Sequence, residues 1–411
     1  MSLKNQSDLH EISRIFDSKK VIEKGTHNLG LRSVREILPF LKDETFCYIK
    51  SRENNWEYLA IGKKDIHDES TDITFGAIPF SKNQPSYIFS PKFFIKRNNK
   101  GTNLYINETL TNLDFSRYFL TKLPQEKSFK STKMCVIPTK ETWVDNINQL
   151  KSFFTKDIGK VVLSRKITFD VNSTSINNLI SNLTLPNQPT SYEYILNNSD
   201  QFFYSVSPEC LFKTNKNEVI IDAIAGTCNR GKEQEDDKVL FHNLVNDPKE
   251  RKEHLIVCDY IKRIATELDL ELSHEELLRP LQLKYIQHIY SKFTFNNSRK
   301  IDPFYISKFL HPTPAVAGTP TATAMKIINN IEESERGFYS GALFVNDPND
   351  DMSEFIVGIR SFRNIKQTKT IEIFGGAGIL PESSPESEWE ETANKMKNFT
   401  TKLKEILNEN Q

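Results

Sequence analysis

The C-terminal stretch of the chain constrains its fold most strongly. A β-branched run, Thr368 to Phe374, predicts a strand, and the glycines that follow it in Gly375 to Gly378 predict a tight bend at the strand end. Ser384 and Pro385 then supply a helix cap and a first helical position. A strand, a glycine bend and a helix in this order leave bare backbone accessible to a small ligand.

The predicted helix carries a charged face. Glu388, Glu391 and Lys395 fall at i, i+3 and i+7, which places two carboxylates and an ammonium on one side of the helix. Such a face is most often simply solvated. Its position beside a glycine bend at a strand end favours a binding site instead, provided that the rest of the chain supplies partners for these groups.

The composition excludes several classes of partner. The chain has 54 basic and 54 acidic residues among its 411, so no charge excess indicates nucleic-acid or membrane binding. The segment Met1 to Lys20 is polar, and no window approaches the length of apolar sequence that spans a bilayer. The five cysteines show no C-x-x-C spacing, which favours free thiols. We therefore expect a soluble cytoplasmic protein.

The order of predicted elements indicates the α+β class, because strands dominate and do not alternate strictly with helices. Short aromatic-rich strands are predicted from 45 to 106, and the polar stretch from 107 to 131 is the best candidate boundary. Later strands are predicted at 160–169, 192–196, 202–206, 218–223, 283–295, 342–345 and 354–362, with a turn at 225–231. Helices are predicted at 139–159, 176–183, 240–244, 247–268, 303–310 and 321–331.

Five stretches with distinctive motifs follow one another along the chain: Lys160 to Arg165, Ser207 to Glu209, Ala225 to Thr227, His311 to Gly318 and Gly376 to Lys395. In their joint order the chain resembles the chorismate-utilising enzymes, the family of isochorismate synthase, salicylate synthase, anthranilate synthase component I and aminodeoxychorismate synthase component I. The resemblance covers the chain from about Glu141 to its end. It implies large antiparallel sheets packed face to face and flanked by helices, with 1–115 as a strand-rich N-terminal part and 116–411 as the chorismate-binding region of one structural unit.

The resemblance implies a magnesium site. Glu253 and Glu391 would hold Mg²⁺, with Glu388 in or just behind its coordination shell. Carboxylate oxygens are the protein ligands that Mg²⁺ prefers, and the ion would neutralise the ring carboxylate of chorismate. Two acidic helix faces would otherwise repel an anionic substrate.

Further residues of the family's site can be carried over by position. Lys395 and the backbone at Gly376 and Gly378 would orient the ring carboxylate, and Tyr339 and Arg360 would hold the pyruvyl carboxylate. The remaining cleft residues implied by the resemblance are His288 beside the ring, and Thr227, Ala315 and Val316 through their backbone.

The resemblance also favours one reaction within the family. Family members that add water carry a lysine at the position of Lys160, and those that use a covalent lysine place it at the position of Ala225. Lys160 would be the base that activates water, and Glu209, with a raised pKa, the acid that protonates the departing hydroxyl. This implies an isochorismate synthase, a monomer or weak dimer that needs no glutaminase subunit. A salicylate synthase and a catalytically silent chorismate-binding subunit are the alternatives.

Overall fold

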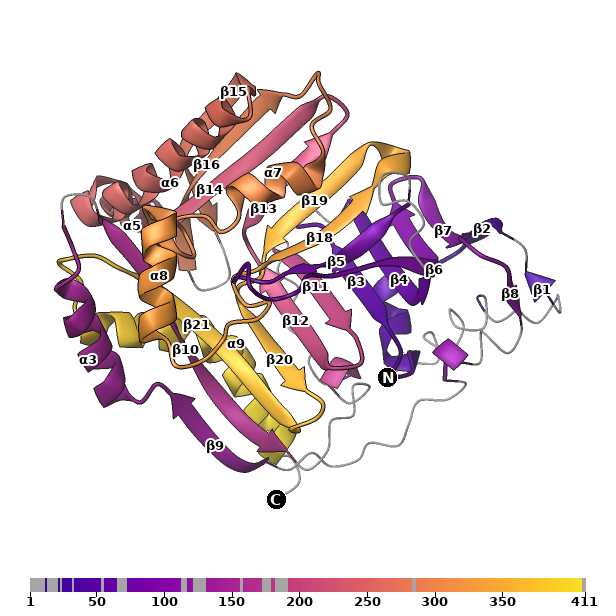
Figure 1. The fold of residues 1–411 in the computed structure, drawn as a ribbon, viewed down its shortest axis with the longest axis horizontal. Coiled ribbons are helices and arrows are strands. Elements are labelled where there is room, and N and C mark those ends of the chain that lie inside the picture. Colours follow the sequence, from indigo (N-terminus) through magenta and orange to yellow (C-terminus); the bar gives the residue numbers. More distant parts are fainter. Residues whose placement is uncertain are drawn as a thin grey trace.

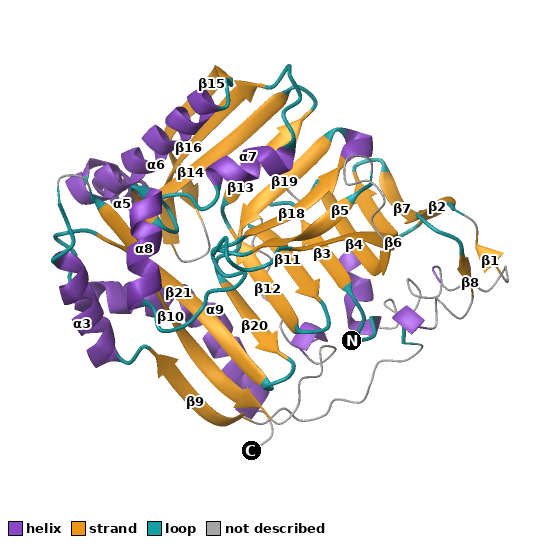
Figure 2. Cartoon of the chain, viewed as in Figure 1, coloured by secondary structure: helices purple, strands orange, loops and turns teal. Residues whose placement is uncertain are grey.

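The structure of the chain is a computed structural model, shown in Figures 1 and 2. It describes residues 12, 21–22, 24–31, 33–52, 55–64, 72–111, 117–120, 131–155, 158–171, 179–181, 191–282 and 286–408. The helices α3 (Lys140–Lys151), α5 (Gln234–Asn246), α6 (Pro248–Glu267) and α8 (Thr321–Ile331) gather at one end of the molecule, and the N-terminal strands form the opposite end (Figure 2).

Two antiparallel sheets make up the body of the protein. The first has the order β9 (Ser131–Ile137), β10 (Lys160–Val171), β21 (Thr370–Ile379), β20 (Ser361–Ile365), β12 (Gln201–Ser207), β11 (Tyr192–Asn197), β3 (Phe46–Lys50), β4 (Trp56–Lys64), β6 (Tyr87–Asn98), β7 (Gly101–Ile106) and β2 (Gly25–Leu29). The short β17 (Gly318–Thr319) also pairs with β10. Residues from both halves of the sequence are therefore hydrogen-bonded into one sheet, through β3 and β11.

The second sheet has the order β15 (Glu271–Gln282), β16 (Ile286–Asn296), β14 (Glu218–Asn229), β13 (Cys210–Asn215), β19 (Met352–Val357), β18 (Ala342–Asp347), β5 (Thr74–Ile78) and β6. Strand β6 takes part in both sheets and links them. A separate short pair joins β1 (Val21–Ile22) to β8 (Leu110–Thr111).

Helices cover the outer faces of the sheets. They are α3 (Lys140–Lys151), α5 (Gln234–Asn246), α6 (Pro248–Glu267), α7 (Pro303–Leu310), α8 (Thr321–Ile331) and α9 (Pro385–Asn408), with the 3₁₀ segments η1 (Val34–Phe40) and η2 (Pro348–Asp350). Figure 1 shows α9 behind β20 and β21, and α6 alongside β14 and β16. This is the α+β architecture expected from the sequence.

Three apolar cores hold these layers together. Aromatic and aliphatic side chains of both sheets meet between them, including Tyr58, Phe75, Tyr194, Phe203 and Leu343. A second core packs α9 and η1 on the first sheet. A third packs α3, α6, α7 and α8 on the second sheet and on the β10–β21 end of the first. Each of these helices thus buries one apolar stripe, as an amphipathic helix of a globular protein does.

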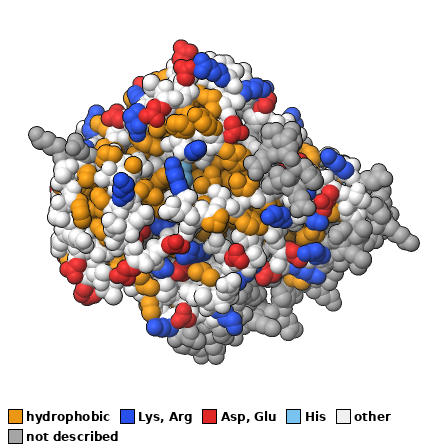
Figure 3. Space-filling model, in the orientation of Figure 1, with side chains coloured by type: hydrophobic (Ala, Val, Ile, Leu, Met, Phe, Trp, Pro, Cys, Tyr) orange, Lys and Arg blue, Asp and Glu red, His pale blue; other side chains and the backbone are white. Residues whose placement is uncertain are grey.

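The surface drawn in Figure 3 mixes charges of both signs. Apolar atoms gather near the middle of this face, and basic and acidic side chains are interspersed around them. None of the helices in the described part of the chain combines the length and apolar sequence needed to cross a bilayer.

Most predicted elements are confirmed, with their boundaries moved by a few residues. The strands from 45 to 106, the hairpin of β11 and β12, strand β10 and helices α5 to α8 lie where the sequence placed them. The predicted helix 176–183 falls largely outside the described residues. The helix predicted to run from Thr139 to Gly159 begins at the predicted cap but ends at Lys151.

The two predicted turns are wrong, and both segments are strand. Gly375 to Gly378 lie inside β21, paired with β10, and Ala225 to Asn229 continue β14 across a bulge at Gly226. Glycine in a strand serves here for close approach rather than bending. A Cβ on Gly375 would lie 2.9 Å from the backbone oxygen of Thr392 in α9, so this glycine lets the helix pack directly on the strand.

Two further corrections concern strands. The single strand predicted at 354–362 is two strands, β19 and β20, which are separated at Gly358 to Arg360, and Arg360 has a left-handed φ of 50°. The edge strand β15 was not predicted, because its residues are largely polar and exposed and show no alternating pattern. Pairing with β16, rather than local propensity, makes it a strand.

The core under α9 should be sensitive to truncation. Phe362 is fully buried and its ring meets those of Phe202, Tyr204 and Phe399. Phe362→Ala should lower the free energy of unfolding by about 3–5 kcal/mol through lost contacts and a cavity. Tyr305→Ala, which truncates a side chain that is 49% exposed, is the control and should cost less than about 1 kcal/mol. Equal costs in urea unfolding would contradict the assignment of this core.

Candidate active site

A cleft lies where the two sheets meet, with α6 and α9 at its rim. It contains about 850 Å³ of empty space, part of which is open to solvent. Every residue that the sequence analysis assigned to a site lines it except Glu388: Lys160, Glu209, Thr227, Glu253, His288, Ala315, Val316, Tyr339, Arg360, Gly376, Gly378, Glu391 and Lys395. These residues come from strands, helices and loops far apart in the sequence, so only the tertiary structure brings them together.

The lysine proposed as base is engaged in an ion pair. Lys160 begins β10, its side chain is 1% exposed, and its Nζ lies 2.5 Å from Oε1 of Glu253 on α6. Gly378 makes room for this pair, since a Cβ there would lie 2.6 Å from Cε of Lys160 and 2.8 Å from Oε1 of Glu253. Any larger residue at 378 would push the two charged groups apart.

The candidate acid has the raised pKa that its role requires. Glu209 lies between β12 and β13 and is 5% exposed. Burial and the nearby carboxylate of Asp222 raise its pKa to about 8, against the opposing charges of Lys160, Lys395 and Arg360. The carboxyl therefore holds its proton at neutral pH.

The acidic face of α9 points into the cleft with its charges paired. Glu391 accepts from Lys395 at 2.5 Å, and Lys395 also donates to the carbonyl of Gly376 at 3.1 Å. Burial opposes ionisation of Glu391, but Lys395 outweighs it and lowers the pKa of Glu391. Glu388 lies one turn earlier, is 2% exposed, and pairs with Lys249 of α6 at 3.3 Å.

Several features of this acidic cluster fit a magnesium ion. Burial and the neighbouring Glu391 raise the pKa of Glu388, and its Oε2 is buried without a hydrogen bond of normal geometry among the described residues. Burial and Glu253 likewise raise the pKa of Glu250. Within the described part of the chain no three potential ligands converge on one point. Mg²⁺ does not need that, because it binds through one or two carboxylates and completes its shell with water and substrate.

The opposite wall of the cleft carries an arginine that is available to an anion. Arg360 lies in the break between β19 and β20, and among the described residues its side chain forms no ion pair or hydrogen bond. Burial lowers its pKa. Ser340, beside Tyr339, also has a positive φ, of 59°, and its amide donates to the carbonyl of Gly358. Strained backbone of this kind is retained where the structure must aim particular groups.

The third side of the cleft is a neutral hydrogen-bonding wall. Nδ1 of His288 lies 2.9 Å from the hydroxyl of Thr227, and burial lowers the pKa of His288 to about 3, so the ring is neutral. Its Nε2 is buried with no partner in the described part of the chain. The amide of Thr227 donates to Glu250 at 3.0 Å. A ligand could therefore engage Nε2 of His288.

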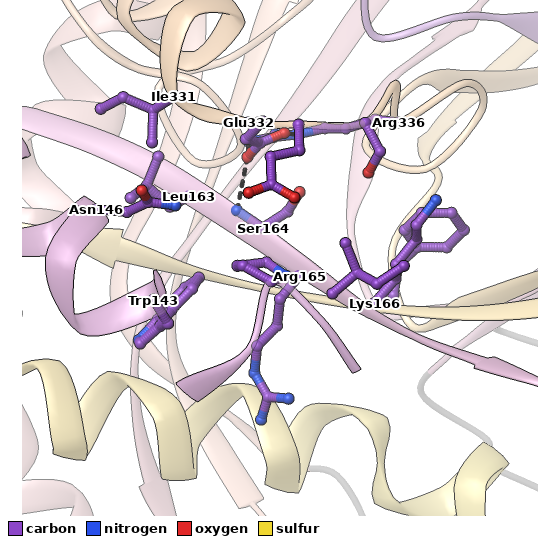
Figure 4. A pocket seen from close by; sticks show the side chains of 14 residues that line it. Trp143, Asn146, Leu163, Ser164, Arg165, Lys166, Ile331, Glu332 and Arg336 are labelled. Carbon is purple, nitrogen blue, oxygen red and sulfur yellow. Dashed lines mark hydrogen bonds and ion pairs between the residues drawn. The ribbon is translucent and has the colours of Figure 1, made fainter. Parts of the chain in front are cut away.

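Helix α9 is clamped to β10 by contacts behind the cleft. Arg165 donates to the hydroxyl of Thr392 at 2.7 Å and to the carbonyl of Trp389 at 3.0 Å, and its guanidinium stacks 3.6 Å from the Trp389 ring. Figure 4 shows Arg165 pointing toward α9, away from a small neighbouring cavity where Glu332 accepts from the amide of Ser164. The clamp holds the turn that carries Glu388 and Glu391.

Two cleft residues with polar side chains were missed by the sequence analysis. Glu250 lines the cleft three residues before Glu253, on the same face of α6, so the helical spacing would have identified it. Ser340 lines it through a loop whose conformation no local pattern predicts. Glu388, which was predicted, lies behind Glu391 and does not line the cleft itself.

Comparison with known proteins identifies the family. Residues 30–404 match the family described as chorismate binding enzyme, and the chain belongs to this family. A solved structure of the menaquinone-specific isochorismate synthase MenF from Escherichia coli superposes with a TM-score of 0.79 at 20% identity, covering 98% of this chain and 99% of that one. The fold is therefore shared over nearly the whole length of both chains.

Curated relatives divide between two activities. The chain is 31% identical over 320 residues to the isochorismate synthase MenF of Haemophilus influenzae, covering 74% of this chain and 72% of the relative. It is 32% identical over 267 residues to MenF of Bacillus subtilis, covering 64% of this chain but only 56% of the relative. Anthranilate synthase component 1 of Aquifex aeolicus is 31% identical over 300 residues, covering 71% of this chain and 58% of the relative.

The raised pKa of Glu209 should be visible in stability. Its pKa is about 8 in the folded protein and near 4.5 when unfolded, so between these values only the folded state keeps the proton. Stability attributable to this group is highest below pH 4.5 and falls as pH rises to 8, by about 1.4 kcal/mol per pKa unit at most. Glu209→Gln removes this dependence. Urea unfolding should show that the free energy of unfolding of the variant, relative to that of the parent, is higher at pH 8.5 than at pH 5 by about a few kcal/mol. The same difference between variant and parent at both pH values would contradict the raised pKa of Glu209.

Proposed function

We propose that the protein is an isochorismate synthase, an isomerase that converts chorismate to isochorismate in a Mg²⁺-dependent reaction. The observation that carries the proposal is the presence of Lys160 and Glu209 in one cleft, with the carboxyl of Glu209 kept protonated by its surroundings. A base and an acid on one substrate are what addition of water and loss of a hydroxyl require.

Lys160 and Glu209 divide the proton transfers. The amine of Lys160 takes a proton from water as the water oxygen bonds to ring C2, the ring double bonds shift, and the C4–O bond breaks. Glu209 gives its proton to the departing hydroxyl, which leaves as water. One water is consumed and one released, so the net reaction is an isomerisation. Lys160 must first leave its ion pair with Glu253 and release one proton to solvent, because only a neutral amine can accept a proton from the attacking water. After turnover Lys160 loses its gained proton to solvent and Glu209 regains one from solvent, which restores both groups.

The cleft also offers suitable partners for the two carboxylates of chorismate. Arg360, whose guanidinium has no ion-pair partner among the described residues, and the hydroxyl of Tyr339 would hold the pyruvyl carboxylate. Lys395 would bind the ring carboxylate from the other end of the cleft. His288 would stay neutral beside the ring and offer Nε2 as a hydrogen-bonding atom.

Glu253 and Glu391 would hold the magnesium ion, supported by Glu388. The bound ion supplies positive charge that neutralises the ring carboxylate. Glu250 adds a further carboxylate to this wall of the cleft, in position to accept hydrogen bonds from water around the ion.

The choice of isochorismate synthase over anthranilate synthase rests on Lys160. Water needs a base at neutral pH whereas ammonia is already a nucleophile, and the family members that use ammonia typically carry glutamine at this position. Aminodeoxychorismate synthases typically form a covalent adduct through a lysine at the position of Ala225. Ala225, which is 8% exposed at the cleft wall, cannot form it. The isochorismate synthases among the relatives agree with this choice. Which pathway consumes the product is decided by the next enzyme and not by this site.

Substitution of the acid or the base should abolish most of the activity. Lys160→Ala and Glu209→Gln should each lower kcat by about 10² to 10⁴, the usual contribution of one acid or base, with a smaller effect on KM. Steady-state assays of isochorismate formation measure this. The control is Lys166→Met, which removes a lysine on the same strand that pairs with Glu372. A Lys160 or Glu209 variant with kcat within a few-fold of the parent would remove that residue from the mechanism.

Activity should depend on magnesium. Exhaustive chelation should abolish isochorismate formation and added Mg²⁺ should restore it, because the acidic cluster would otherwise repel the substrate. Glu253→Gln and Glu391→Gln should raise the Mg²⁺ concentration needed for half-maximal activity. Full turnover after chelation would show that the carboxylates serve another purpose.

The product distinguishes the remaining alternatives. Purified protein given chorismate and Mg²⁺ should release isochorismate intact, as followed by chromatography, because the stretch His311 to Gly318 most resembles that of the synthases that stop at isochorismate. Ammonium salts at high pH should give no aminated product, since Lys160 stands where the amine-adding members lack a base and Ala225 cannot form a covalent adduct. Stoichiometric salicylate and pyruvate would assign the lyase reaction to this protein as well, anthranilate or aminodeoxychorismate would move it to the amine-adding branch, and no product would favour a silent binding subunit.

A further inference from the structure

Each carboxylate assigned to the metal site is paired with a lysine, and the three lysines come from three different elements. Glu253 pairs with Lys160 of β10, Glu391 with Lys395 within α9, and Glu388 with Lys249 of α6. Lys160 and Lys395 already have roles toward the substrate. Lys249 has none, and it joins the two helices that carry the acidic cluster.

The first turn of α6 and two carboxylates hold Lys249 between α6 and α9. It stands in the first turn of α6, where Asp247 caps the helix by accepting from the amides of Lys249 and Glu250. Its Nζ lies 3.3 Å from Glu388 and 3.9 Å from Glu250, and its side chain is 32% exposed. It therefore reaches across from α6 to α9 and places one positive charge between two carboxylates.

We propose that Lys249 competes with the metal ion for the carboxylate of Glu388, and so sets the affinity of the site for divalent cations. The oxygen Oε1 of Glu388 that accepts from Lys249 must give up that contact before it can coordinate an ion. Although Oε2 has no such contact among the described residues, the charge of Lys249 also opposes a second positive charge there. Binding of Mg²⁺ at Glu253 would displace Lys160 in the same way and free its amine. The inference rests on the proposed function only for the location of the metal site.

The competition has a physical rationale. Three lysines contact the four carboxylates of Glu250, Glu253, Glu388 and Glu391, which places these like charges in one region of the two helices. Without counter-charges they would repel one another in a partly buried cleft. A partly exposed lysine supplies counter-charge that a divalent cation can replace. The site is thereby kept stable but weak, so that ion and substrate can both leave.

The test is a direct measurement of metal binding, with Mn²⁺ as the probe and electron paramagnetic resonance of free Mn²⁺ as the readout, at pH 8. Lys249→Met keeps the apolar stem and removes the charge, so it should bind Mn²⁺ about ten-fold more tightly than the parent. Lys249→Arg keeps the charge and should bind within about two-fold of the parent. Lys262→Met is the matched control: it removes a lysine of the same helix that pairs with Glu275, outside the cleft.

The Mn²⁺ titration is repeated with chorismate present in the Glu209→Gln background, where turnover should be slowed by about 10² to 10⁴. Tighter binding by Lys249→Met alone, in both conditions, supports the proposal. Unchanged binding would show that Lys249 is an ordinary surface partner of Glu388, and weaker binding would show that it holds Glu388 in place for the ion; either result overturns the proposal. A parent that binds no Mn²⁺ would overturn it together with the metal requirement. Isochorismate formation, assayed separately, tests the proposed function independently of these outcomes.

Discussion

The cleft depends on the antiparallel pairing of β10 with β21. This ladder runs from Val161 opposite Ile379 to Asp170 opposite Thr370, and it carries Lys160 at one end. The glycines of β21 carry no side chain. This lets α9 pack directly on the strand at Gly375 and lets the Lys160–Glu253 pair lie over Gly378. A side chain at either position would move the acidic helix or separate the charged pair. The glycines of β21 therefore make room for the proposed catalytic lysine and the proposed metal carboxylates to lie close together.

Charge balance is the second constraint on the cleft. The chain is neutral overall, yet the cleft and its rim gather four glutamates from two helices. Buried carboxylates are costly unless they are paired. Lysines from β10, α6 and α9 supply this pairing, and one carboxyl, that of Glu209, stays protonated instead. The same arrangement leaves Arg360 without an ion-pair partner in the described part of the chain, and so available to an anionic ligand.

Much of this could be predicted from local patterns. Strand β10, the hairpin β11–β12 and helices α6 to α9 follow from apolar periodicity, caps and prolines, because these act over a few residues. Helical spacing alone was enough to put Glu388, Glu391 and Lys395 on one face. Local reasoning failed where partners far away in sequence decide the conformation. The glycines of β21 were mistaken for a bend because their strand partner, β10, lies far earlier in the chain, and β15 was missed because its pairing with β16 outweighs its polar sequence.

The sequence alone determined the family, the α+β class and the identity of most residues at the site, since these depend on motif order and on short-range periodicity. Only the tertiary structure decided how the charges are distributed among those residues. It placed Lys160 on Glu253, placed Lys249 between α6 and α9, left Arg360 at a strained break between two strands, and buried Glu209 beside Asp222 so that its pKa rises. Electrostatic interactions act through space and depend on burial, and neither the distances nor the burial can be read from the order of residues along a chain.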